Sequence, residues 1–158
     1  MDVVWRCQTL DELNSRDLLQ MLILRSRVFV VEQQCIYLDP DALDGLPETR
    51  HLSLWQEGTL LACLRLLPPG ASYPEPSLGR VVVAPEARGQ GWSRPLLQQA
   101  LRAIAQYWPD WPVVISAQSY LLGLYQSLGF LPEGEPYLED GIPHQQMRYV
   151  PSAEKESP

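Results

Sequence analysis

Apolar residues along the chain recur at spacings that predict short strands and helices. An extended apolar segment at 3–7 is followed by helical spacing over 10–29. Thr9 and Glu12 match a capping box, which predicts that this helix begins there. Its end is open, because the apolar run 28–31 could instead begin an extended segment. The pattern predicts a strand followed by a long helix.

The next segment, 33–50, combines acidic residues with Pro and Gly and therefore predicts a loop. Its carboxylates are expected to be solvated, and they are Asp39, Asp41, Asp44 and Glu48. Arg25 and Arg27 are expected on the polar side of the preceding helix. Arg65 lies among apolar residues and needs an acidic partner if it is buried. His51 opens a strand and is expected to make a structural hydrogen bond.

Strands are predicted over 51–56, 60–67, 78–85 and 112–117, with one or two more in 142–150. Residues 57–59 suit a hairpin turn, and the Pro-rich stretch 68–76 suits an irregular connection. Helices are predicted over 119–130 and, after a loop, within 86–108. The order β-α-β-β-β-α-β-α-β predicts one mixed α/β domain over 3–150, followed by a polar tail at 151–158.

Composition excludes several classes of protein. The chain has 158 residues, 46% of them hydrophobic, which is enough for one packed domain. A net charge of −7 argues against nucleic-acid binding. The sequence has neither an apolar run long enough to span a membrane nor a signal peptide, so no membrane association and a cytoplasmic location are predicted. Three cysteines without a C-x-x-C pair, and two distant histidines, predict no disulfide framework and no metal site; Cys63 is expected in the core.

The segment 81–93 (VVVAPEARGQGWS) carries the most specific chemistry. It predicts a strand that ends at Pro85, a turn with Gly89 and Gly91, and the start of a helix. Glycine lets the backbone approach a ligand closely, and the unpaired N–H groups at a helix start favour an anion such as a pyrophosphate. The same glycines could equally serve only the geometry of the turn.

Two motifs resemble those of the GNAT N-acetyltransferases. Arg88-x-x-Gly91-x-Ser93 is similar to the acyl-CoA signature Arg/Gln-x-x-Gly-x-Gly/Ala, with Ser in the last position. Tyr125-x-x-x-Gly129-Phe130 is similar to the family's Tyr-x-x-x-Gly-Phe, and Gln118 stands where Asn is frequent. Three further phrases, at 28–33, 116–118 and 139–144, resemble the ElaA-type subfamily, so the resemblance extends over most of 3–150.

This resemblance implies a single-domain GNAT fold, with a central mixed, mostly antiparallel sheet flanked by helices. It implies acetyl-CoA as cosubstrate, no metal, and direct transfer of the acetyl group to an amine, either a small molecule or a peptide N-terminus. A homodimer is possible. The implied cofactor-binding residues are Val81, Val82, Val83, Arg88, Gly89, Gln90, Gly91, Trp92, Ser93, Arg94 and Gln118.

The resemblance also implies roles in catalysis. Tyr125 would give a proton to the thiol sulfur, although its position in the apolar stripe of a helix equally suits a core residue. Glu32 would bind the acceptor or act as base, Glu139 and Asp140 would line the acceptor site, and His144 would relay a proton; a solvated helix end and an exposed turn remain the alternatives. The rival function is a degenerate GNAT module that binds CoA or a protein without catalysis.

Overall fold

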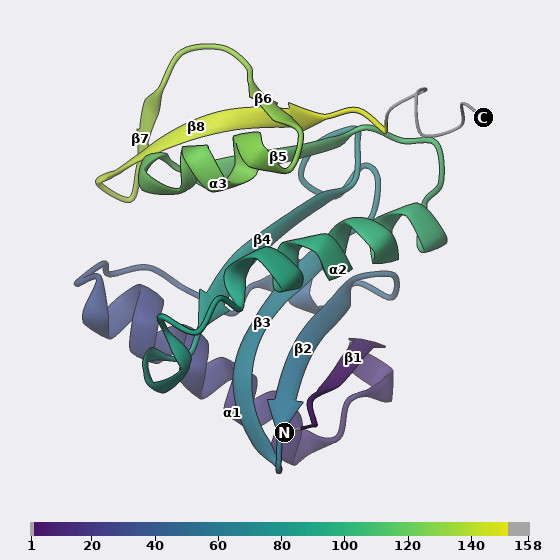
Figure 1. The fold of residues 1–158 in the computed structure, drawn as a ribbon, viewed down its shortest axis with the longest axis vertical. Coiled ribbons are helices and arrows are strands. Elements are labelled where there is room, and N and C mark those ends of the chain that lie inside the picture. Colours follow the sequence, from purple (N-terminus) through teal and green to yellow (C-terminus); the bar gives the residue numbers. More distant parts are fainter. Residues whose placement is uncertain (1, 152–158) are drawn as a thin grey trace.

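Two antiparallel sheets and three α-helices form the fold in a computed structural model that describes residues 2–151 (Figure 1). The strands are β1 (Val4–Thr9), β2 (Arg50–Gln56), β3 (Thr59–Leu67), β4 (Ser77–Val83), β5 (Val113–Gln118), β6 (Phe130–Pro132), β7 (Tyr137–Glu139) and β8 (Ile142–Tyr149). The α-helices are α1 (Ser15–Arg25), α2 (Ser93–Tyr107) and α3 (Leu122–Ser127). Short helical turns cover Leu10–Glu12, Ser26–Glu32, Ala42–Gly45, Pro85–Ala87 and Ser119–Leu121. The predicted element order is confirmed, with two additional short strands before β8.

The first sheet has the order β1-β2-β3-β4, and all its pairs are antiparallel. The strand β3 is buried from Leu60 to Leu67, so its apolar run shows no alternation. Helices cover both faces of this sheet, with α2 in front and α1 behind in Figure 1. The helix α2 contributes a buried stripe, which consists of Leu96, Leu97, Ala100, Ala103 and Ile104. Burial on both faces explains why a continuous apolar segment forms this strand.

The second sheet has the order β5-β8-β6, with β7 paired to the other end of β8. Phe130 and Met147 lie fully buried in its core. The N-terminal half of the chain and this sheet share one hydrophobic core, so the described part of the predicted 3–150 domain packs as one body. Most of the predicted polar tail, 152–158, lies outside the described residues.

The first helix differs from the expectation at both ends. Thr9 and Glu12 do form a capping box, but it caps only the short turn Leu10–Glu12. The helix α1 begins at Ser15, where the Asn14 side chain accepts a hydrogen bond from Asp17 N at 2.8 Å. Beyond Arg25 the chain continues as a wider π-helical turn, Ser26–Glu32. The run 28–31 is therefore helical rather than extended, and it carries Glu32 to the end of the turn.

The expectation of a solvated acidic loop is wrong for most of its residues. Asp39 and Asp44 are buried, and so is Arg25, which was expected on a polar helix face. Arg25 donates to the carboxylates of both, at 2.8 and 2.9 Å. Burial is possible because each charge has a partner of opposite sign. Only Glu48 of the four acidic residues is exposed, and Arg27 is exposed as expected.

Other expectations for polar residues are confirmed. Arg65 is buried and donates to Asp41 Oδ1 at 2.7 Å. His51 is buried, with Nε2 3.1 Å from the carbonyl oxygen of Asp44, and burial lowers the pKa of its imidazole. Cys63 lies in the core, where burial raises the pKa of its thiol to about 12.

Candidate active site

The two sheets separate where β4 and β5 diverge. The strands start together, since Val114 N donates to the carbonyl oxygen of Pro76 at 3.1 Å, but they then belong to different sheets. Because both strands begin at this contact, they run in the same direction, and the gap between them widens toward their ends at Val83 and Gln118. A cavity of about 560 Å³ fills the opening and is lined by residues from both strands. This volume lies in the range of small-molecule sites.

A bulge in β4 shapes one wall of this cavity. Cys63 lies opposite Val82, whereas Arg65 lies opposite Gly79, so Leu64 of β3 faces two residues of β4. Arg80, within the bulge, has a φ of 52°, in the left-handed region. Beyond the bulge, Ala84 N donates to Leu61 O at 2.8 Å. Successive N–H groups of a strand alternate in direction. The N–H of Val83 therefore faces the cleft.

The turn before α2 forms a second cavity that joins the first. Gly89 and Gly91 have φ of 78° and 83°, and a Cβ at either would meet nothing within 4 Å. Trp92 at the N-cap makes no side-chain hydrogen bond to the first turn of α2, so the first N–H groups of the helix have no side-chain cap. The two cavities share Val83, Arg88, Ser93 and Leu124. Glycine backbone, free N–H groups and the helix dipole make this end suitable for a phosphate or pyrophosphate.

Arg88 and Glu32 face each other at the edge of the cavity. The guanidinium donates to both carboxylate oxygens, at 2.8 and 2.5 Å. The Arg88 hydrogen bond lowers the pKa of the Glu32 carboxyl, which is therefore ionised at neutral pH. Both side chains are more than 40% exposed. In this arrangement Glu32 suits the binding of a cation better than the uptake of a proton.

Tyr125 lies at the junction of the cleft and the α3 helix. It is 4% exposed and packs edge-on against Phe130, with ring centroids 5.4 Å apart. It also lines the cavity between β4 and β5, so it is both a core and a cavity residue. Burial raises the pKa of its phenol. The hydroxyl thus keeps its proton across the ordinary pH range and can donate it.

His144 and Glu139 form a small polar cluster on the opposite wall. Nδ1 of His144 lies 2.7 Å from the carbonyl oxygen of Ile142, which can only accept, so Nδ1 carries the proton. Nε2 is 3.8 Å from Glu139 Oε2. The ring stacks on Tyr137 with centroids 6.1 Å apart. Nε2 is therefore the atom of His144 that can take a proton, and Glu139 would stabilise the resulting imidazolium.

Most of the predicted site residues come together around these cavities. The cavity between β4 and β5 is lined by Glu32, Val81, Val82, Val83, Arg88, Ser93, Gln118, Tyr125, Glu139, Asp140 and His144. The adjoining one is lined by Gly89, Gly91, Trp92 and Arg94, together with the shared residues. Gln90 lines neither; its side chain is exposed and accepts a hydrogen bond from Trp92 Nε1 at 3.2 Å.

A family model for the acetyltransferase (GNAT) domain matches residues 42–151. The chain belongs to the GNAT acetyltransferase family. It is similar to Protein ElaA of Escherichia coli (strain K12), with 39% identity over 142 residues that cover 90% of this chain and 93% of ElaA.

Solved structures agree with this assignment. The crystal structure of an acyl-CoA N-acyltransferase from Pseudomonas aeruginosa is 44% identical, with a TM-score of 0.90 over 94% of this chain and all of that one. The crystal structure of Escherichia coli ElaA is 37% identical, with a TM-score of 0.88 over 94% and 99% of the two chains. The implied single-domain GNAT fold is thereby confirmed.

Several residues of this GNAT site were not predicted. Ser116 lies in the cleft and is hydrogen-bonded to the hydroxyl of Tyr137 and, at 3.2 Å, to Glu139 Oε1. Tyr73, from the irregular connection 68–76, also lines the cavity, and burial raises the pKa of its phenol to about 12. Gln33 exchanges side-chain hydrogen bonds with Gln118 at 3.4–3.5 Å. Gln33 and Ser116 lie within the phrases 28–33 and 116–118, which resemble the ElaA-type subfamily and could have pointed to them. Tyr73 lies in no such phrase, and the fold of the connection before β4 brings it to the cleft.

Two further observations concern metals and membranes. Between residues 2 and 151, His, Cys, Asp and Glu side chains form no group of three or more that could hold a metal ion. Within the same range, no helix has the length and apolar character needed to cross a bilayer.

Proposed function

We propose that this GNAT protein is an N-acetyltransferase, which transfers an acetyl group from acetyl-CoA directly to an amine. The observation that carries the proposal is the joined pair of cavities. One end has a glycine turn at an uncapped helix start, and the other has Tyr125, His144 and carboxylates around a cleft between two diverging strands. An elongated ligand with an anionic end fits this arrangement.

The residues around the glycine turn fit a pyrophosphate, which supports the proposal that acetyl-CoA binds at this end. The free N–H groups at the start of α2 would donate to it, and the open space over Gly89 and Gly91 leaves room for it. Arg88 and Arg94 line this end and supply positive charge. The pantetheine arm would lie along Val81–Val83, next to the exposed side of β4. Gln118 lies at the end of β5, on the facing side of the cleft, and lines the same cavity.

At the reacting end, the chain supplies two functions to the thioester. The Val83 N–H faces the cleft, where it would donate to the carbonyl oxygen as negative charge builds on it. Tyr125 would give its proton to the sulfur as the thiol leaves. Because the amine attacks the carbonyl carbon itself, this route needs no covalent intermediate on the protein.

The acceptor is proposed to be a cationic amine. Among residues 2–151, Glu139 is hydrogen-bonded to Ser116 and lies near His144, and no arginine forms an ion pair with it. Asp140, in the turn after it, lines the same cavity. A bound ammonium must lose a proton before it attacks, and His144 Nε2 would accept that proton. Glu32 would become available to the amine once Arg88 turns to the pyrophosphate.

Thermal unfolding in the presence of acetyl-CoA, CoA and ATP tests the binding part of the proposal. A ligand at 100 times its Kd adds about 2.7 kcal/mol to the free energy of unfolding. We expect stabilisation by acetyl-CoA and CoA but not by ATP. Equal stabilisation by ATP would instead indicate a general phosphate site. Stabilisation by acetyl-CoA without thiol release, across a panel of amines, would favour the degenerate binding module. Cytoplasmic location and a homodimer stay predictions.

A further inference from the structure

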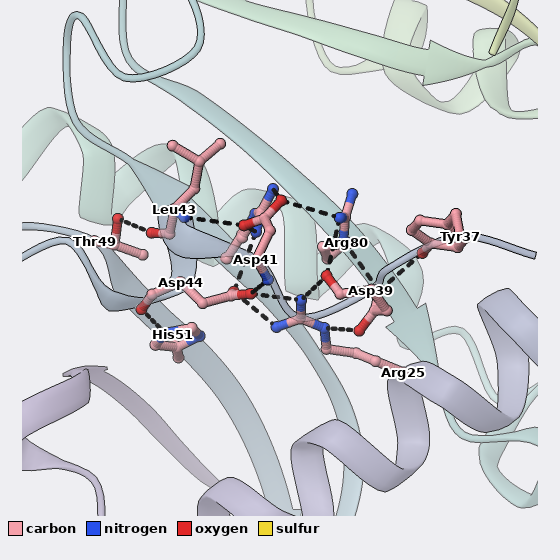
Figure 2. Close-up of polar contacts among 10 residues, drawn as sticks. Arg25, Tyr37, Asp39, Asp41, Leu43, Asp44, Thr49, His51 and Arg80 are labelled. Atoms are coloured by element: carbon pink, nitrogen blue, oxygen red, sulfur yellow. Dashed lines mark hydrogen bonds and ion pairs between the residues drawn. The ribbon is translucent and has the colours of Figure 1, made fainter. Parts of the chain in front are cut away.

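A buried network of charges includes Arg80 of the β4 bulge (Figure 2). It joins three arginines to three aspartates from four parts of the chain: Arg25 of α1, Asp39, Asp41 and Asp44 of the loop, Arg65 of β3 and Arg80 of β4. Arg25, Asp39 and Arg65 are each no more than 5% exposed. The formal charges balance, and nothing in the proposed chemistry uses them.

Stability alone does not account for such a network. The desolvation of buried charges offsets much of their attraction, and apolar side chains of similar size can be as stabilising. The best-attested use of a buried polar network is to fix one geometry of the chain among several. The contacts of the network show which segment of the chain it can fix.

Arg80 joins the network to the bulge of β4 at the active site. Its Nη2 donates to the carbonyl oxygen of Asp39 at 3.0 Å and to Asp41 Oδ2 at 3.3 Å, and its Nε lies 3.0 Å from Asp39 Oδ1. The ring of Tyr37 lies 5.2 Å from the guanidinium, and its hydroxyl donates to Asp39 Oδ1 at 2.8 Å. Tyr37, Arg65 and Arg80 also line the cavity between β4 and β5. Two residues of the network, Arg65 and Arg80, thus form part of one wall of the site.

The backbone at Arg80 is unusual for its residue type. A φ of 52° is disfavoured for a long side chain, and such residues cluster where function requires the conformation. A bulge changes the direction in which the following backbone groups point. Here those groups belong to Val81–Val83, the segment proposed to meet the acyl donor. Arg80 lies within the bulge, and its guanidinium contacts both Asp39 and Asp41.

We infer that Arg80, held by Asp39 and Asp41, is a positioning residue that aims the N–H groups of β4 at the thioester carbonyl of the acyl donor; the inference rests on the proposed function. Loss of the Arg80 side chain would leave the glycine turn and the start of α2 unchanged. Affinity for acetyl-CoA should then change little, while polarisation of its carbonyl and turnover should both decrease.

The test compares Arg80→Gly with Arg6→Gly. Glycine adopts a positive φ without strain, so Arg80→Gly removes the contacts without adding backbone strain. Arg6 is a matched control, because it also has an aspartate partner, Asp17 at 2.9 Å, and an aromatic neighbour, Trp55 at 5.2 Å. It lies on β1 and lines neither cavity. Arg80→Lys, which keeps the charge without the planar fork, is the milder variant if Arg80→Gly does not fold.

The readout is the ¹³C resonance of acetyl-CoA labelled at the acetyl carbonyl, measured free and bound. We expect a shift on binding to the wild type and to Arg6→Gly, a much smaller one with Arg80→Gly and an intermediate one with Arg80→Lys. We expect dissociation constants within about threefold of each other. With an amine that the wild type acetylates, kcat of Arg80→Gly should fall on the order of 10- to 100-fold, less than for complete loss of an oxyanion donor.

Each other outcome overturns a different statement. A wild-type carbonyl shift in Arg80→Gly or, if that variant does not fold, in Arg80→Lys would make the network merely structural, whatever the melting temperature. A wild type that binds acetyl-CoA without a carbonyl shift would overturn the inference and leave the binding intact. A wild type that does not bind acetyl-CoA would overturn the proposed function and the inference together.

Discussion

Substitution of Gly91 by Val separates the cofactor role of the glycine turn from its structural role. Gly91 has a φ of 83°, and a Cβ there would point into open space in the cavity at the start of α2. The branched side chain would occupy the volume assigned to the pyrophosphate. We expect the variant to fold but to lose its affinity for acetyl-CoA.

The structural cost can be matched by Gly58→Val. Gly58 has a φ of 78°, also with nothing within 4 Å of a Cβ, and it lies in the β2–β3 hairpin away from both cavities. Left-handed backbone costs an L-residue roughly 1–2 kcal/mol. For a chain of this length each kcal/mol lowers Tm by about 2–4 °C, so both variants should melt roughly 2–8 °C below the wild type.

Thermal shift with acetyl-CoA then distinguishes the two variants. At 100 times its Kd the ligand adds about 2.7 kcal/mol, which corresponds to roughly 5–11 °C for this chain length. Gly58→Val should keep this increase, and Gly91→Val should show none. An equal increase in both variants would refute the assignment of the turn as the pyrophosphate site, because the backbone strain is common to both.

Three further predictions follow from contacts in the structure. Tyr125→Phe should lower kcat by roughly 10²–10⁴-fold with little change in acetyl-CoA affinity, because the ring and its packing on Phe130 remain; unchanged turnover in a steady-state thiol-release assay would leave Tyr125 as a core residue only. Glu32→Gln should tighten acetyl-CoA binding, on the order of two- to fivefold in calorimetry, because Arg88 no longer has to break its ion pair with Glu32 to reach the pyrophosphate. Equal or weaker binding would mean that Arg88 does not reach the pyrophosphate. Burial alone would raise the pKa of Asp44, but Arg25 and its neighbours lower it from 3.8 to about 2. The stability that Asp44 contributes is therefore present above pH 3.8 and lost as the pH falls through 2, about 2 kcal/mol in all; chemical denaturation as a function of pH should show this decrease in the wild type and not in Asp44→Asn.

The sequence predicted the elements that depend on local pattern. The glycine turn, the helix that follows it and Tyr125 at a fixed distance from Gly129 could all be placed from spacing and motif. So could β3, because its apolar run is continuous. These features are set within a few neighbouring residues, and the structure has them where they were expected.

The charge network could not be predicted in this way. Its partners lie far apart in sequence: Arg25 is 14 residues from Asp39, and Arg80 is 41 residues from it. An arginine in a helix and acidic residues among prolines are each typical of exposed positions. Each pattern taken alone therefore predicts that these side chains are solvated. Burial is possible only because the folded chain pairs all of them at once. The π-helical turn at 26–32 was likewise not predicted, because the apolar run 28–31 is compatible with an extended segment as well as with a helix.

The most direct test of the central claim is acetyl transfer itself. Purified protein would be incubated with acetyl-CoA and a panel of primary amines that includes diamines, amino-acid amides, peptide N-termini and acidic amines. Released thiol and acetylated product would be quantified together, the product by mass spectrometry. The account predicts equal amounts of thiol and of one acetylated amine, with cationic acceptors preferred and acidic ones inactive. Thiol release without any acetylated amine, or turnover of acidic acceptors alone, would contradict it.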